Sequence, residues 1–128
     1  MTPTKRTSSD SRNRKRITKV LPVDCTVVDL PNVRVDLMEG STFGGRTVNL
    51  SKTGIQIHSD YELDPKTVVD VVLSLDAPAR RKVTVRVEVA WAKKNAIDLY
   101  GRWRMGMHIV KAKAIDLEDL HDYFDAVS

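Results

Sequence analysis

The feature that most constrains how this chain can fold is a strict alternation of apolar and polar residues over positions 82–92. Successive side chains of a β-strand point to opposite faces, so an apolar residue at every second position buries one face and leaves the other in water. Residues 82–92 are therefore predicted to form a half-buried strand. The face that we expect to pack into the core holds Val83, Val85, Val87, Val89 and Trp91.

Similar signals recur along the chain. The same alternation appears over 32–39 and over 102–110, where it predicts two more strands. Turn-forming residues separate the stretches, and Gly44-Gly45 is among them, which predicts a hairpin turn at that point. The remaining predicted strands are 23–30, 46–50, 54–59 and 67–75.

The apolar period changes near the C-terminus. Leu117, Leu120 and Phe124 recur at helical spacing behind Asp116, a residue type that favours the N-cap position, so a helix is predicted over about 115–127. Many short strands followed by one helix indicate a mainly all-β fold. We expect a small antiparallel β-barrel, closed or partly open, because closure removes exposed sheet edges.

The length and composition indicate one ordinary domain. A chain of 128 residues can bury a core without metals or disulfides. The single cysteine, Cys25, cannot form an internal disulfide, and no apolar run approaches the roughly 18 residues of a membrane span. We expect a cytoplasmic protein without membrane insertion, in which Cys25 is a small core residue.

The positive charge is concentrated at the N-terminus. Residues 1–19 contain seven basic residues against Asp10 alone, whereas positions 20–110 are nearly neutral. Residues 1–11 are polar without apolar periodicity, which predicts a disordered tail, and 12–128 would form the folded domain with a flexible basic arm at 12–19. Such an arm attracts anions, and charge does not distinguish a nucleotide from nucleic acid or a lipid surface.

Two short motifs stand out from this background. The arm contains Arg12 and Arg16 in an R-x-x-x-R pattern, and a predicted turn between strands contains Asn49, Ser51 and Gly54 in an N-x-S-x-x-G pattern. Taken singly, the first is also expected in any basic tail and the second in any β-turn. In this order, within a β-rich chain, the pair closely resembles the signature of the PilZ domain family.

The resemblance covers about residues 12–126, because the alternating strand ending in Trp91 and the later strand around Gly106 also match. PilZ domains are six-stranded β-barrels that bind cyclic di-GMP, so the resemblance implies that fold and that ligand. It also implies a stand-alone receptor that acts in motility, surface polysaccharide, biofilm or virulence control through an unidentified protein partner.

The residue types suit this ligand. An arginine fork matches the O6 and N7 atoms of guanine, pairs with phosphate and stacks on a purine, which favours Arg12 and Arg16 for guanine and phosphate contacts. Asn49 and Ser51 offer a carbonyl and a hydroxyl, and Gly54 allows close approach. The family often has Asp where Asn49 stands, and a neutral amide lacks the charge-assisted bond. Arg14 and Lys15 would add secondary contacts.

Other site chemistries find little support in the sequence. His58, His108 and His121 lack metal-ligand spacing, so neither a metal site nor a cofactor is expected. Ser51 has no base close in sequence, so no catalytic residue is proposed and the protein is expected not to be an enzyme. Trp103, like the Met105 and Met107 pair, is expected to pack in the core.

Two alternative functions remain open. A small barrel with a basic arm can bind nucleic acid, although the few aromatic residues and the nearly neutral barrel argue against nucleic acid as a partner. A PilZ-like scaffold that has lost ligand binding could instead act through protein contacts alone. The salt dependence of binding separates nucleic acid from a ligand with two phosphates, because a polymer contact weakens far more steeply with salt.

Overall fold

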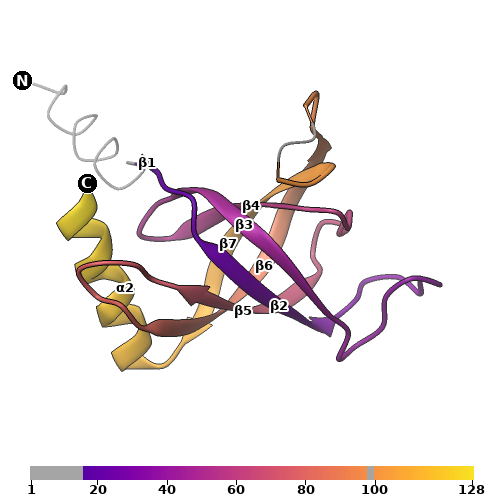
Figure 1. Cartoon of the computed structure of the whole chain (residues 1–128). Coiled ribbons are helices and arrows are strands. Elements are labelled where there is room, and N and C mark those ends of the chain that lie inside the picture. The colour runs from indigo at the N-terminus through magenta and orange to yellow at the C-terminus, as the bar shows by residue number, and fades with distance from the viewer. Residues whose placement is uncertain (1–15, 98–99) are drawn as a thin grey trace, which may run out of the picture.

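The computed structural model describes residues 16–97 and 100–128. Within these ranges the chain forms seven strands followed by one helix (Figure 1). The elements are β1 (Ile17–Thr18), β2 (Pro22–Asp29), β3 (Thr42–Leu50), β4 (Gly54–Ser59), β5 (Val68–Ser74), β6 (Lys82–Lys94), β7 (Trp103–Ala112) and α2 (Ala114–Val127).

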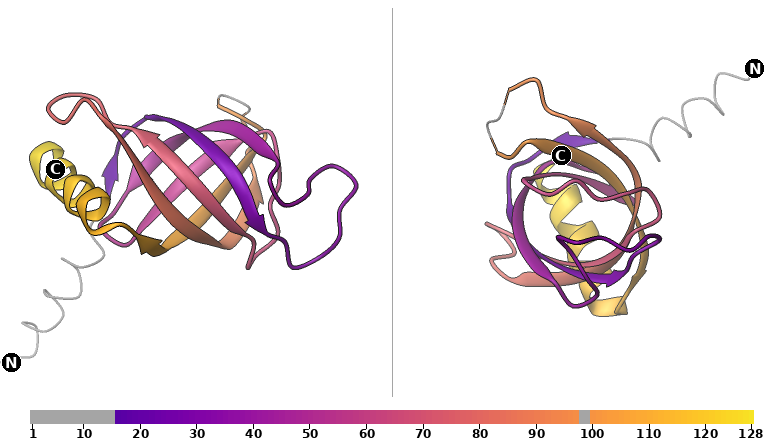
Figure 2. Two further views of the ribbon diagram at one scale, coloured as in Figure 1. Left: turned by 90° about the horizontal axis from the view of Figure 1, so that it is seen from below. Right: turned by 90° about the vertical axis from the view of Figure 1, so that its right-hand side faces the viewer.

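Six of the strands close into an antiparallel barrel. Their order is β3-β2-β5-β6-β7-β4, and β3 also pairs with β4, which completes the ring. The short β1 is an extra strand that pairs with the end of β3. Figure 2 shows the barrel from the side and along its axis, with α2 lying across one end. The predicted six-stranded barrel with a C-terminal helix is confirmed.

The core fills the barrel interior with side chains from the alternating strands. Every second residue of β5 and of the first part of β6 is at most 1% exposed, and Cys25 of β2 is fully buried. On α2, Leu120, Tyr123 and Phe124 are buried and close one end of this core. Within the described residues, no helix is long and apolar enough to cross a membrane.

The strand predicted over 32–39 is wrong, because this stretch is a long loop between β2 and β3. Val33 and Val35 are fully exposed, and only Leu37 of the alternating set is buried. Arg34 pairs with Asp36 at 2.7 Å within the loop and donates a hydrogen bond to the backbone oxygen of Glu62, which anchors the loop. The apolar alternation therefore has no packed face behind it here, and alternation alone cannot distinguish such a loop from a strand.

Two boundaries also differ from the prediction. Gly44-Gly45 lies inside β3 rather than in a hairpin turn, and a Cβ on Gly45 would lie 2.7 Å from the backbone oxygen of His58 on the neighbouring β4. The glycine thus permits close strand packing. Helix α2 begins at Ala114, so Asp116 is not the N-cap but lies in the first turn, where it pairs with Arg81 at 2.8 Å.

Candidate functional site

The structure brings the end of the basic arm against the second motif. Arg16 is the first described residue, and its Nη1 donates a hydrogen bond of 3.1 Å to Oδ1 of Asn49. The pairing of β1 with β3 at Thr18 and Asn49 fixes this approach. Arg12, Arg14 and Lys15 lie outside the described residues.

A β-bulge turns Asn49 to the outside of the barrel. Thr47 pairs with Ile57, and Asn49 pairs with Gln56, so Val48 is an extra residue in β3. Without it, Asn49 would share the inward direction of the fully buried Thr47. Bulges are common next to functional sites because they redirect side chains in this way.

Gln56 is a neighbour of the motif that the sequence analysis did not single out. Its Oε1 accepts a hydrogen bond of 2.9 Å from Nδ2 of Asn49. The Asn49 amide is therefore held at both ends, with its oxygen on Arg16 and its nitrogen on Gln56. The alternation of Ile55 and Ile57 with Gln56 already placed Gln56 on the outer face, but only the strand register shows which residue it meets.

Ser51 and Gly54 form the turn that joins β3 to β4. Ser51 is only 4% exposed, and its Oγ accepts a hydrogen bond of 3.1 Å from the backbone N–H of Gly54. A Cβ on Gly54 would lie 2.7 Å from the backbone oxygen of Met107 in β7. In this structure Ser51 shapes the turn, and Gly54 allows β4 to approach β7 closely.

Trp91 does not belong to the core, contrary to the sequence analysis. A register shift between Val89 and Trp91 changes the face of β6 to which the following side chains point, so Val89 points inward and Trp91 is half-buried on the outside. Its indole lies over Gly106 of β7, where a Cβ would be 2.3 Å from the ring. Nζ of Lys93 lies 5.3 Å from the centre of that ring. Met105 and Met107, by contrast, are buried in the core as predicted.

These features form one row across the outer face of four strands. Asn49 pairs with Gln56, Gln56 with Gly106, and Gly106 with Trp91. We call these four residues the amide–tryptophan row. Two β-bulges, one at each end, direct its two end members outward. The row offers amide donors and acceptors beside a flat aromatic ring, and this combination suits the edge and the face of a purine.

The histidines have separate roles in the structure. Nε2 of His121 on α2 lies 3.0 Å from the backbone oxygen of Lys52, and Nε2 of His108 lies 3.4 Å from Glu88. Among residues 16–97 and 100–128, no three histidine, cysteine or acidic side chains gather as a metal site would require. Burial, with a smaller effect of Asp24, raises the pKa of Cys25 to about 12, so its thiol is protonated at neutral pH.

Comparison with protein families gives one match. The model of the PilZ domain matches residues 10–126, which include both sequence motifs and the amide–tryptophan row. No curated protein matches the sequence.

Solved structures with the same fold include three informative relatives. MotI (DgrA), an inhibitor of motility from Bacillus subtilis, superposes with a TM-score of 0.62 at 14% identity over 84% of this chain and 46% of MotI, so this chain spans less than half of that relative. The PilZ domain of CeSA from a cellulose-synthesizing bacterium gives 0.61 at 15% identity, over 89% of this chain and 99% of that domain. The PilZ domain of YcgR from Escherichia coli, solved with c-di-GMP, gives 0.60 at 11% identity, over 84% and 83% of the two chains.

Proposed function

This chain belongs to the PilZ domain family, and on that premise we propose that it is a non-enzymatic receptor for cyclic di-GMP. The observation that carries the proposal is the contact between the two motifs. The end of the basic arm meets Asn49 on the outside of the barrel, beside a surface with the hydrogen-bonding groups and the aromatic face that a guanine requires. The relative solved with c-di-GMP shares the fold.

Each part of the site has a role in this proposal. Arg12 and Arg16 contact guanine edges and phosphate, and Arg14 and Lys15 add attraction. Asn49 exchanges its bond with Arg16 for one to a guanine donor. The buried Ser51 and Gly54 act by holding the β3–β4 turn in place.

The amide at position 49 affects how firmly the arm is held before ligand binds. A carboxylate there would form an ion pair with Arg16, whereas Asn49 offers a neutral acceptor at 3.1 Å. Hydrogen bonds between a charged and a neutral group are weaker than those between two opposite charges. Arg16 is therefore released easily to the ligand, and Asn49 in turn binds guanine less tightly than Asp would.

We propose further that ligand binding orders the arm over the barrel. A segment of polar and basic residues that folds on a ligand creates a new surface, which a protein partner in the cytoplasm can recognise. Hydrogen exchange tests this step: amides of residues 8–18 should become protected when the protein is saturated with cyclic di-GMP. Unchanged exchange at saturation would contradict arm ordering without affecting the binding proposal.

The decisive experiment is calorimetric titration of the full chain with cyclic di-GMP, with GTP as a control ligand. We expect micromolar or tighter binding of cyclic di-GMP only, lost in an Arg12→Ala/Arg16→Ala variant. The matched control is Lys5→Ala/Arg6→Ala, which removes the same charge from the same arm outside the motif. Equal losses in both variants would show that only the total charge matters. No binding by the natural chain would favour the scaffold that acts through protein contacts.

A further inference from the structure

A second row of side chains crosses the same outer face next to the amide–tryptophan row. Arg46 of β3 pairs with His58 of β4, His58 with Arg104 of β7, and Arg104 with Lys93 of β6. We call these four residues the basic row. They are distant in the sequence, and the strand register alone brings them together. The nearly neutral charge total of positions 20–110 therefore concealed a local concentration of cations.

Among the residues that the structure describes, the cations of the basic row have no carboxylate partner, unlike other arginines of this protein. Arg81 pairs with Asp116 and Arg86 with Asp70, whereas no ion pair involves the basic row within the described residues. Nε of Arg104 is buried and has no hydrogen-bond partner there. A charged donor without an acceptor is costly, and an anion that draws this half-buried side chain outward would supply one.

His58 contributes a donor rather than a charge to the basic row. Its burial, together with the nearby charge of Arg104, lowers its pKa, so the imidazole is neutral at pH 7. Nδ1 of His58 lies 3.4 Å from the side-chain nitrogen of Asn95 and can accept its hydrogen bond, which leaves Nε2–H as the donor. The positive charge of the row comes from its two arginines and Lys93.

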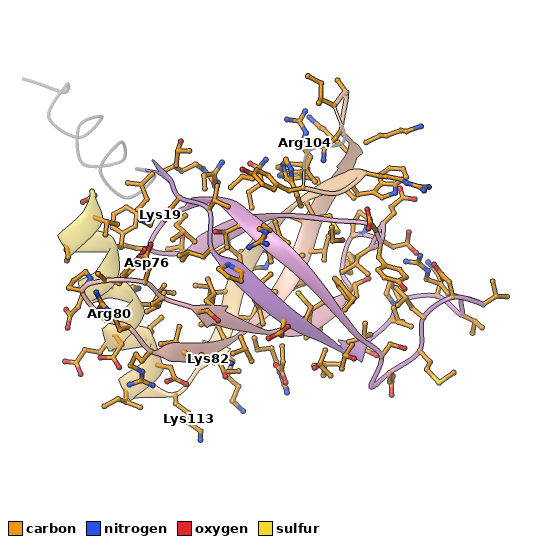
Figure 3. The ribbon with its side chains drawn as sticks, viewed as in Figure 1. Lys19, Asp76, Arg80, Lys82, Arg104 and Lys113 are labelled. Carbon is orange, nitrogen blue, oxygen red and sulfur yellow. The ribbon has the colours of Figure 1, made fainter. Side chains whose placement is uncertain are left out.

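The arm and the basic row lie on opposite sides of the amide–tryptophan row. The arm reaches β3 at Asn49 and Leu50, near the β3–β4 turn. The basic row lies on the other side, towards the β6–β7 connection, about 7 Å away along the strands. In Figure 3, Arg104 is well separated from Lys19, which marks the base of the arm.

We propose that the basic row is a second phosphate site, which binds one phosphate of cyclic di-GMP while the arm binds the other. This inference rests on the proposed function. The ligand carries its two phosphates on opposite sides of its ring, and the two cationic groups lie on opposite sides of the row that suits a guanine. The basic row spans only four strands, about 14 Å, which matches a small phosphate ester better than a polymer.

The test compares cyclic di-GMP titrations of the full chain at several salt concentrations with those of Arg104→Gln and Arg46→Gln. Each variant should bind about tenfold more weakly at unchanged stoichiometry, and its affinity should fall less steeply with salt because a phosphate contact is lost. Arg46 is exposed, so its replacement should leave the thermal midpoint unchanged and separate binding from folding. The matched control is Lys82→Gln, an exposed cation at the far end of β6, which should bind like the natural chain (Figure 3).

The outcomes are distinguishable from failure of the proposed function. If the natural chain binds cyclic di-GMP and both arginine variants bind equally well with the same salt slope, the second phosphate site is wrong while the receptor proposal stands. If the natural chain does not bind the ligand at all, both proposals fall. Tighter binding of a single-stranded oligonucleotide than of cyclic di-GMP, lost in the same variants, would also overturn this inference and assign the basic row to nucleic acid.

Discussion

The barrel has two walls that differ in their strand pairing: a regular wall of β5 and the first part of β6, and a bulged wall of β3, β4, β7 and the end of β6. Strand β5 pairs with the first part of β6 through Val68–Ser74 without a register shift, and the inward residues of both strands are almost completely buried. On the wall formed by β3, β4, β7 and the end of β6, the β3–β4 and β6–β7 pairings are shifted by bulges. The regular wall contributes buried apolar area, whereas the bulged wall redirects Asn49 and Trp91 outward. The regular wall thus provides much of the stability, whereas the bulged wall carries the surface that we propose for ligand recognition.

The largest effect should come from a cavity in the regular wall. Leu73 of β5 is fully buried, so Leu73→Ala removes apolar contacts and leaves a space that the surrounding strands cannot fill completely. We expect the free energy of unfolding to fall by about 3 kcal/mol. Urea denaturation followed by fluorescence measures this change. The folded fraction should bind cyclic di-GMP with nearly natural affinity, because Leu73 lies away from the outer face of the bulged wall.

Val33→Ala is the control for this prediction. Val33 is equally apolar but fully exposed in the β2–β3 loop, so its replacement should change the free energy of unfolding by less than about 0.5 kcal/mol. Similar losses in the two variants would show that the 30–41 loop packs in solution, and the assignment of stability to the regular wall would be too simple.

The contrast between the walls also explains what the sequence could predict. Unbroken alternation identified β6 and β7 to within a few residues, because a continuous pattern follows directly from one buried face. The direction of Trp91 was missed, since a bulge depends on the partner strand and leaves the apolar pattern intact. The exposed 32–39 loop was missed for the opposite reason, because its pattern exists without a packed face.

The candidate site was predictable only in part. The two motifs identified Asn49 and Arg16 as members of one site, and the structure places them in contact. Gln56 and Arg104 became visible only through the strand register, since nothing in the linear sequence relates them to Asn49. A charge count along the chain cannot detect cations that come together from different strands.

An intermediate effect, on binding rather than folding, should follow from Trp91→Ala in the bulged wall. Stacking of a base on an aromatic ring is worth roughly 1–3 kcal/mol, so cyclic di-GMP affinity should fall between about fivefold and about 150-fold. Stability should fall less than in Leu73→Ala, because Trp91 is half-buried on the outer face. Calorimetric titration and urea denaturation measure the two quantities separately.

Trp103→Phe is the matched control for Trp91→Ala. Trp103 is also half-buried but starts β7 at the barrel end, so its replacement should leave affinity unchanged. The variant also leaves Trp91 as the single tryptophan, whose fluorescence should change on ligand binding if a guanine stacks on it. Unchanged fluorescence at saturation, together with natural affinity in Trp91→Ala, would remove Trp91 from the site.

The smallest effect concerns pH, and it sharpens the comparison because the buried apolar contacts of the two walls do not depend on a titrating group. The base of the arm does: Lys19 pairs with Asp76 at 3.0 Å, and Asp76 also accepts a hydrogen bond from Tyr123 of α2. The bond from Tyr123, followed by that from Lys19, lowers the pKa of Asp76 below its ordinary value of 3.8. A carboxylate with a lowered pKa stabilises the folded state above pH 3.8, and this contribution is lost as the pH falls through the lowered value. Acid should therefore loosen the contacts of Lys19 and Tyr123 before the barrel unfolds.

Amide exchange followed from pH 5 to pH 2 checks this order of events. Protection near Lys19 and along α2 should decrease first, and Asp76→Asn should make that protection low and nearly independent of pH in this range. Asp36→Asn is the matched control, because Arg34 lowers the pKa of Asp36 in the distant β2–β3 loop. It should leave exchange near Lys19 unchanged. Since both carboxylates are exposed, each contributes little to global stability. If β5 and α2 lose protection at the same pH, the base of the arm and the regular wall unfold as one unit. The two regions would then not differ in their stability to acid.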